Sequence, residues 1–133
     1  MIPFLSLKKI NQPFEIAFQD KMKQFLEVGW YILGNEAKQF EANFATYCGT
    51  KHCIGVGNGL DALVLIFKAY IHLGKLQKGD EVIVPANTYI ASILAVLQAD
   101  LVPVLVEPRL ETFNINPEEI EAKITSKTKA ILP

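Results

Sequence analysis

Short apolar runs alternate with helix-like segments in the second half of the chain, and this alternation constrains the fold most. Residues 81–85, 101–106 and 129–133 are nearly continuous apolar runs, and residues 60–72 and 88–98 have helical patterns. Strands without a polar face are typical of parallel sheets that are covered on both sides. The sequence therefore predicts an α/β fold with a mostly parallel sheet in a three-layer α/β/α architecture.

The first half of the chain has helical periodicity. Phe14, Phe18, Met22 and Phe25 recur at helical spacing, and the predicted helix ends near Gly29. We therefore predict an N-terminal helical segment over residues 1–50 and an α/β portion over residues 51–133, within a single domain.

The α/β portion is expected to begin with a short strand over residues 52–57. The chain has 133 residues and stops within an apolar run. We expect it to be the N-terminal part of a longer protein. A small edge strand at a true C-terminus is the alternative.

Charge and cysteine content limit the possible partners. Thirteen Lys and Arg residues face 14 Asp and Glu residues, and the net charge is -1. This balance gives no reason to expect binding to nucleic acid or to a membrane. Cys48 and Cys53 lack enough nearby ligands for zinc, so we expect no metal site and two reduced thiols. The N-terminus lacks the basic-then-apolar order of a secretory signal, and we predict a cytoplasmic protein.

The segment at residues 52–63 combines an apolar run, a glycine turn and a helix start. Free backbone amides at a helix N-terminus, next to residues without side chains, form an anion site that suits a phosphate. The segment is not a P-loop, because no Lys-Ser or Lys-Thr pair follows the glycines. A dinucleotide fold fits poorly, since Leu60 stands where the third glycine belongs. A tight turn without a ligand is the alternative.

A second candidate segment follows the run at residues 81–85. Ligands of open α/β sheets bind outside the carboxyl ends of the strands, so Asn87, Thr88 and Tyr89 are expected to face the same crevice as the glycine turn. A flat aromatic ring near a phosphate site suggests a phosphorylated ring cofactor. Ordinary packing of Tyr89 and helix capping by Thr88 are the alternative.

Together these segments resemble the DegT-type nucleotide-sugar aminotransferases, which are pyridoxal-phosphate enzymes of the aspartate-aminotransferase fold. The resemblance covers nearly the whole chain, in family order and at family spacing. It rests on residues 29–34 with Phe40-Glu41, on Gly57-Asn58-Gly59-Leu60-Asp61-Ala62-Leu63, on residues 79–85 with Thr88-Tyr89, and on residues 103–104, 112–115 and 128–131. It implies the N-terminal part of the large domain of a type I pyridoxal-phosphate transferase.

The resemblance also implies specific roles. The main chain at Gly59, Leu60 and Asp61 would hold the phosphate of pyridoxal 5'-phosphate, and Tyr89 would stack on its ring. Glu107 stands where the family has Asp. No lysine of the chain lies in a context like the family's Ser-Phe-x-x-x-Lys segment, and the family's Asp that pairs with the pyridine nitrogen is also absent. The Schiff-base lysine is therefore missing, and no catalytic residue is assigned.

These roles imply an aminotransferase that moves an amino group from an amino acid, with glutamate as the expected donor, to a nucleotide-linked keto-sugar. The form of the glycine turn points to a dTDP-3-keto-6-deoxyhexose. We expect a homodimer, with the apolar residues 30–33 as a candidate contact, and no activity for these 133 residues alone. The alternative is a non-catalytic phosphate-binding or assembly module that pairs with another chain. A nicotinamide-dependent dehydrogenase is a third and weaker hypothesis.

Overall fold

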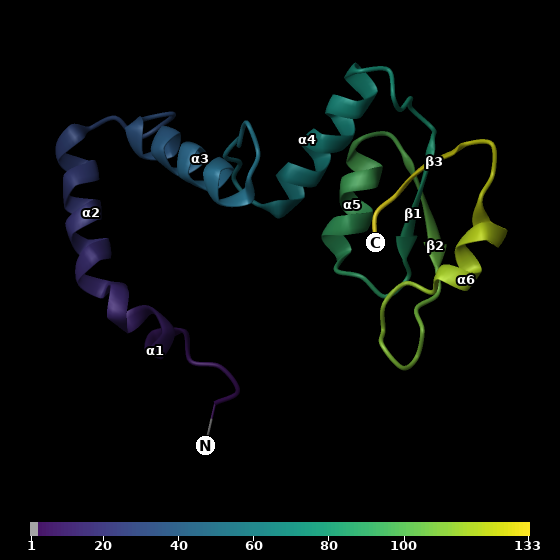
Figure 1. Cartoon of the computed structure of the whole chain (residues 1–133), viewed down its shortest axis with the longest axis horizontal. Helices are drawn as coiled ribbons and strands as arrows, with labels where there is room; N and C mark the ends of the chain where they lie inside the picture. Colours follow the sequence, from purple (N-terminus) through teal and green to yellow (C-terminus); the bar gives the residue numbers. More distant parts are fainter. Residues whose placement is uncertain (1–2) are drawn as a thin grey trace. The chain divides into compact units, whose positions relative to one another are not determined.

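A computed structural model describes residues 3–133 of the chain (Figure 1). Two compact units divide it between Gly55 and Val56. The described elements of the first unit are helices, and the second unit contains the sheet and its covering helices. The two units are described separately.

The first unit consists of helices whose ends follow from local sequence. Its elements are α1 (Leu7–Asn11), the 3₁₀ turn η1 (Gln12–Phe14), α2 (Glu15–Val28) and α3 (Asn35–Cys48). Helix α2 ends at Gly29, with φ of 68°, and α3 ends at Gly49, with φ of 67°. A left-handed residue stops a helix at little cost only when it has no Cβ, which explains both glycines. The helices predicted from periodicity are confirmed.

The helices of the first unit bury little of their apolar surface. Helix α2 has no buried residue, and Ala45 is the only buried residue of α3. The rings of Phe25 and Tyr31 lie 4.9 Å apart. An ion pair of 3.3 Å joins Lys21 of α2 to Glu36 of α3. Local contacts of this kind hold the first unit in place of a core.

The second unit is built on a parallel sheet of three strands in the order β2-β1-β3. Its elements are α4 (Gly59–His72), β1 (Glu81–Pro85), α5 (Ile90–Gln98), β2 (Val102–Val106), α6 (Pro117–Ile120), the 3₁₀ turn η2 (Glu121–Lys123) and β3 (Thr128–Ile131). The register pairs Glu81 with Val102 on one side of β1, and Ile83 with Ile131 on the other. The predicted parallel sheet is therefore confirmed.

Strand β1 lies at the centre of the core. Val82 and Val84 pack in one cluster with Phe67 of α4 and Val96 of α5. Ile83 points to the opposite face, since side chains alternate along a strand, and it too has no exposed surface. Both faces of β1 are therefore covered.

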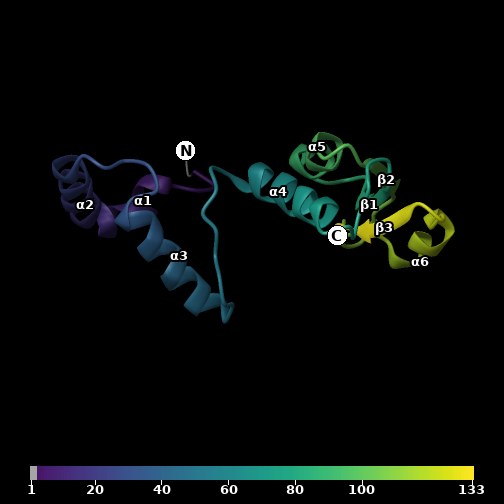
Figure 2. The ribbon, with the colours of Figure 1, turned by 90° about the horizontal axis from the view of Figure 1, so that it is seen from above.

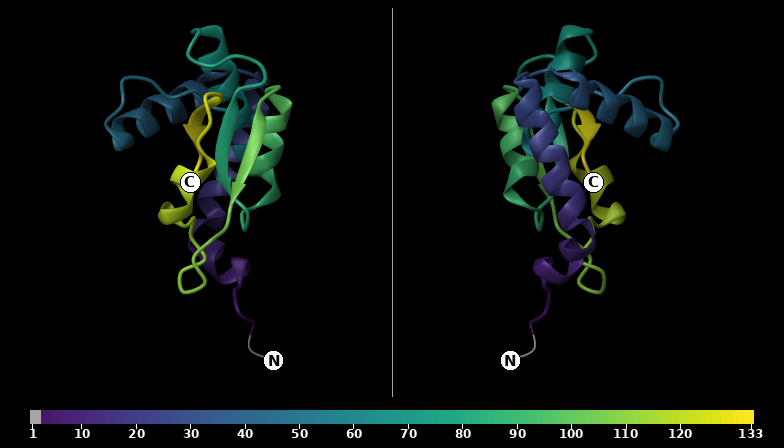
Figure 3. Two further views of the ribbon diagram at one scale, coloured as in Figure 1. Left: turned by 90° about the vertical axis from the view of Figure 1, so that its right-hand side faces the viewer. Right: turned by 90° about the vertical axis from the view of Figure 1, so that its left-hand side faces the viewer.

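The connections of the sheet explain how its two faces are covered. The chain runs from β1 to β2 at one edge of the sheet and from β2 to β3 at the other. Right-handed crossovers then require α5 and α6 to lie on opposite faces. They do so in two further views (Figures 2 and 3). The α/β fold class is confirmed in this arrangement.

Some local predictions are wrong. Residues 52–57 form no strand, because no described strand pairs with them, and the Gly55 amide instead donates to a carboxylate oxygen of Glu41 at 2.7 Å. The helix predicted over residues 88–98 is present as α5 and begins two residues later, at Ile90. Asn116 caps α6, which continues only to Ile120 before it tightens into η2. Within residues 3–133, no helix is both long enough and apolar enough to cross a bilayer.

Candidate functional site

The start of α4 is closed by a reciprocal cap, in which the Asn58 side chain pairs with both the backbone amide and the side chain of Asp61. Asn58, the N-cap residue, has an extended backbone, and its Oδ1 accepts a hydrogen bond from the Asp61 amide at 3.0 Å. Its Nδ2 donates to Oδ2 of Asp61 at 3.0 Å. Asn is among the preferred N-cap residues because its side chain satisfies a free amide of the first turn. The cap therefore holds the turn in one conformation.

The cap leaves two amides of the turn free. Neither Gly59 nor Leu60 donates its amide to another residue of the described chain. A Cβ built on Gly59 would meet no atom within 4 Å, so the main chain is open to approach there. Two free amides at the positive end of a helix of 14 residues are a suitable place for an anion.

The Asp61 amide is engaged by the cap, so the amides of Gly59, Leu60 and Asp61 are not equivalent. The carboxylate of Asp61 also lies close to the glycine turn, because a Cβ on Gly57 would come within 3.1 Å of its Oδ2. Sequence reasoning placed Asp61 among the phosphate donors and missed the cap. The signal was present, since Asn before a helix with Asp three residues later is a capping pattern.

Tyr89 lies at the start of α5, just beyond the carboxyl end of β1. It is the N-cap residue of α5, and 80% of its surface is exposed. The Ala86 amide donates to the Val106 carbonyl at 2.8 Å, and this bond fixes the start of the loop that leads to Tyr89. In Figure 1 the N-terminal ends of α4 and α5 and the carboxyl ends of β1 and β2 point the same way. The turn before α4 and the start of α5 therefore lie on the side of the second unit toward which the strands run.

One side chain of the first unit holds the segment that precedes the turn. Glu41 on α3 accepts the Gly55 amide, and a Cβ on Gly55 would lie 3.4 Å from the same oxygen. A side chain at position 55 would therefore only come into ordinary contact with Glu41. Sequence reasoning cited Glu41 only as part of a motif and did not foresee this contact.

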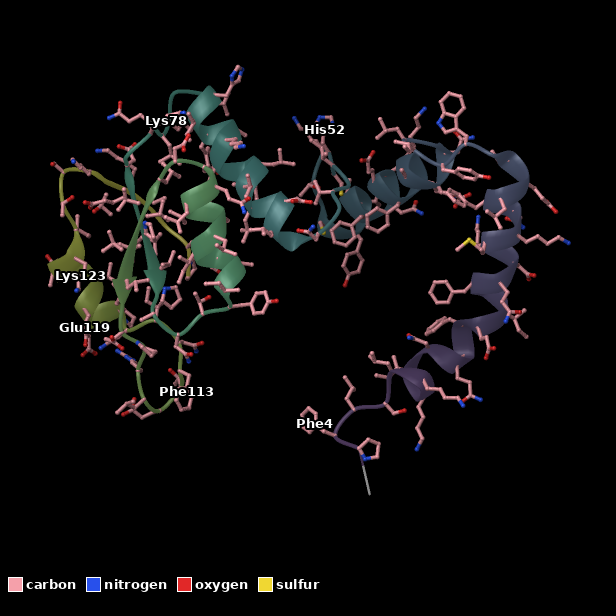
Figure 4. The ribbon with its side chains drawn as sticks, turned by 180° about the vertical axis from the view of Figure 1, so that it is seen from behind. Phe4, His52, Lys78, Phe113, Glu119 and Lys123 are labelled. Atoms are coloured by element: carbon pink, nitrogen blue, oxygen red, sulfur yellow. The ribbon has the colours of Figure 1, made fainter. Side chains whose placement is uncertain are left out.

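The groups with clearly shifted pKa values lie at the amino ends of the strands, the end opposite to the glycine turn. Hydrogen bonds from Thr125 and then Thr128 lower the pKa of Glu81, which begins β1. Lys78 and Asp100 pair at 2.7 Å, which raises the pKa of the lysine and lowers that of the aspartate. Figure 4 labels Lys78 on the loop before β1. These shifts reflect contacts that hold the amino ends of the strands, away from the turn and Tyr89.

Comparison with known families places most of the chain in one of them. Residues 14–133 match the model of the DegT/DnrJ/EryC1/StrS aminotransferase family. This match covers both the glycine turn and Tyr89.

Individual relatives agree with the family match. The chain is 58% identical to the dTDP-3-amino-3,6-dideoxy-alpha-D-galactopyranose transaminase of Aneurinibacillus thermoaerophilus, over 99% of this chain and 35% of that protein. A crystal structure of S. venezuelae DesV with a ketimine intermediate matches with a TM-score of 0.86 and 43% identity, over 99% of this chain and 34% of that one. NtdA of Bacillus subtilis with bound cofactor PMP matches with a TM-score of 0.84 and 36% identity, over 99% and 30%. The chain therefore spans about a third of the length of these relatives.

Proposed function

The chain belongs to the DegT/DnrJ/EryC1/StrS aminotransferase family, and from this membership we propose that it is the cofactor-binding N-terminal part of a pyridoxal-phosphate-dependent aminotransferase. The complete enzyme transfers an amino group from an amino acid, glutamate in our proposal, to a nucleotide-linked keto-sugar. The 58% identity to a dTDP-3-amino-sugar transaminase supports a dTDP-3-keto-6-deoxyhexose as the acceptor.

The observation that carries the proposal is the pair of free amides at the start of α4, within a chain of this family. In our proposal the Gly59 and Leu60 amides donate to the phosphate of pyridoxal 5'-phosphate, which the open main chain at Gly59 permits. Asp61, whose amide is engaged, acts with Asn58 to hold the turn. Tyr89 contributes its exposed ring as the surface on which the pyridine ring stacks. When bound, the cofactor supplies an electron sink for amino-group transfer.

We propose that the 133-residue chain alone is inactive, since none of its lysines stands in a segment like Ser-Phe-x-x-x-Lys. The alternative is a module that binds phosphate or assembles with another chain that carries the lysine. The reading frame separates the two proposals. Continuation past codon 133 into an aspartate and a Ser-Phe-x-x-x-Lys segment supports the aminotransferase, and a stop codon there supports the module.

We also propose a cytoplasmic homodimer. Cys48 and Cys53 are both free thiols, as is usual for proteins of a reducing compartment. The connection after α2 exposes four large apolar residues, which supports residues 30–33 as part of a subunit contact. Sedimentation of the complete enzyme tests this assembly. A monomer at micromolar concentration contradicts it.

The phosphate assignment is tested by a matched pair of variants at Gly59. Proline is favoured at the first position of a helix and suits the extended backbone of Asn58, so Gly59→Pro removes the amide hydrogen while the helix start persists. Gly59→Ala adds a similar carbon atom but keeps the amide. We expect pyridoxamine 5'-phosphate to bind the proline variant more weakly than the alanine variant, and equal affinities would contradict the assignment.

Amide NMR spectra of the unmodified chain give a second readout that needs no activity. Titration with pyridoxamine 5'-phosphate is expected to shift the Gly59 and Leu60 amide signals. Pyridoxamine, which lacks the phosphate, is the control ligand and should leave them in place. Shifts of the same size with both ligands would mean that the turn does not recognise the phosphate.

A further inference from the structure

Asn58 and Gly59 form the dipeptide in which an asparagine side chain is most open to attack by its own backbone. Gly59 has no side chain to shield its amide nitrogen, and both residues are exposed. We propose that Asn58 is a deamidation site that Asp61 holds inactive as long as the reciprocal cap at the start of α4 is intact.

The chemistry needs no reagent except water. The Gly59 amide nitrogen loses its proton and forms a bond to Cγ of Asn58, and the bond from Cγ to Nδ2 breaks. The departing NH₂ group takes up a proton and leaves as ammonia, so a succinimide ring remains. Water then opens either carbonyl of the ring and leaves aspartate or isoaspartate at position 58. Nothing is oxidised or reduced.

The cap opposes the first of these steps through geometry. Ring closure requires the Gly59 nitrogen to swing toward Cβ of Asn58, so that the two are nearly eclipsed about the Cα–C bond. The observed ψ of 175° places them about 60° apart instead, by tetrahedral geometry at Cα. This rotation must also break the two hydrogen bonds of the Asn58 side chain, one donated by its Nδ2 to Asp61 and one accepted by its Oδ1 from the Asp61 amide.

Little besides Asp61 protects this pair of residues within the described chain. A Cβ at Gly59 would meet no atom within 4 Å, and the Gly59 amide donates no hydrogen bond that would restrain its nitrogen. The Asn58 carbonyl accepts the Ala62 amide at 3.2 Å, a contact that depends on the same first turn. Loss of the Asp61 side chain therefore removes the hydrogen bond that Nδ2 of Asn58 donates, and only the backbone amide of position 61 still holds the reactive side-chain amide through its Oδ1.

Deamidation would also change the proposed phosphate site, and this consequence rests on the proposed function. Aspartate at position 58 places a second negative charge beside the free amides of Gly59 and Leu60. Isoaspartate also lengthens the main chain of the turn by one methylene. Either product weakens phosphate binding there, because its carboxylate competes with the phosphate for the positive end of the helix.

The test follows the modification by peptide mass spectrometry during incubation at mildly alkaline pH. It compares the unmodified chain with Asp61→Ala, which removes the partner, and with Asp61→Asn, which keeps an oxygen that accepts from Asn58. Gly59→Pro is the chemical control, since it has no amide hydrogen to lose. The unmodified chain in urea sets the rate without any cap, and circular dichroism checks that each variant is folded.

We expect deamidation at Asn58 to be at least several-fold faster in Asp61→Ala than in the unmodified chain or Asp61→Asn, to stay below the rate in urea because the backbone amide of position 61 still donates to Oδ1 of Asn58, and to be absent in Gly59→Pro. An Asp61→Ala variant that is folded and deamidates no faster than the unmodified chain would overturn the proposal. So would a folded unmodified chain that reacts as fast as the unfolded one.

The Asn58→Asp variant separates this inference from the proposed function. Weaker binding of pyridoxamine 5'-phosphate than in the unmodified chain is the expected result. If binding is unchanged while Asp61→Ala deamidates rapidly, the phosphate assignment is wrong and the protective role of Asp61 stands.

Discussion

The two units of the chain have similar apolar patterns but bury them very differently. In the second unit, Val82, Val84 and Val96 have no exposed surface and belong to one cluster. In the first unit, Phe18 and Phe40 are more than half exposed although they lie on regular apolar stripes. The second unit therefore has its own core. Among the described residues of the first unit, the apolar stripes of the helices stay largely exposed.

This difference separates helix formation from burial. Helical periodicity, together with glycines that adopt positive φ, gives α2 and α3 clear boundaries. Burial needs a second surface, and a sheet supplies one for α4 and α5. Because burial of apolar surface supplies most of the stability of a fold, the second unit is expected to be the more stable of the two.

The largest expected effect sets one substitution in each unit against the other. Ile83→Ala removes a fully buried side chain from β1 and should cost about 2–5 kcal/mol of unfolding free energy. Phe18→Ala alters an exposed side chain of α2 and should change stability by no more than about 0.5 kcal/mol. Hydrogen exchange of amides in β1 and in α2 measures each unit separately.

The conservative variant Ile83→Val, with an expected cost of about 0.5–1.5 kcal/mol, checks that lost volume causes the effect. Equal losses of stability in Ile83→Ala and Phe18→Ala would contradict this comparison, because they would show that the apolar side chains of α2 are buried in solution.

A smaller effect is expected at the helix starts, where the units also differ. Asn58 caps α4 through its side chain, whereas Phe14 before α2 makes no such hydrogen bond. Asn58→Ala should destabilise the second unit by about 1 kcal/mol, and Asn58→Ser should recover most of the loss because serine is a good N-cap residue. Urea unfolding followed by circular dichroism measures both variants. No loss in the alanine variant would mean that the cap does not stabilise α4.

Sequence patterns predicted those elements whose determinants are local. Strand β1 agrees with the predicted residues 81–85, and the helix end at Gly29 was predicted from the sequence. Asn116 accepts the Glu118 amide as a cap, which its residue type favours. Each of these features depends on nearby residues, so each can be read from the sequence.

Features that depend on a distant partner were not predictable in this way. Residues 52–57 have the composition of a strand, but a strand requires a neighbour with free backbone groups, and Glu41 satisfies Gly55 instead. The segment of α4 is apolar nearly all round, yet Leu65 and Ile66 are about half exposed. At the candidate site, the prediction from sequence did not distinguish the engaged amide of Asp61 from its two free neighbours, and the roles of the turn and Tyr89 stay predictions.

Acid should weaken the second unit at a specific contact. Hydrogen bonds from Thr125 and Thr128 hold the pKa of Glu81 below the ordinary glutamate value of about 4.3. Because the folded pKa lies below the unfolded one, this contribution to stability is complete above the unfolded value and is lost as the pH falls through the folded value. Chemical unfolding at a series of acidic pH values measures it.

Glu81→Gln is the matched control, since glutamine still accepts from the two hydroxyls but does not titrate. Its stability should fall less steeply with acid than that of the unmodified chain. Parallel curves for the two proteins would show that the Glu81 carboxylate contributes nothing to the acid response.

The smallest expected effect concerns the first unit, where an ion pair joins two helices without a core beneath them. Lys21 and Glu36 lie 3.3 Å apart, and both side chains are more than half exposed. Solvent and salt screen such a pair, so its removal by Lys21→Met should cost only about 0.2–1 kcal/mol, and less in high salt. Helix content measured by circular dichroism in low and high salt tests this value, with Lys23→Met on the same helix as the control. A loss several times larger would show that the packing of α2 against α3 depends on this pair. The first unit would then rely on a single local contact, whereas the second relies on its buried core, and the two units would differ even more than their buried surfaces imply.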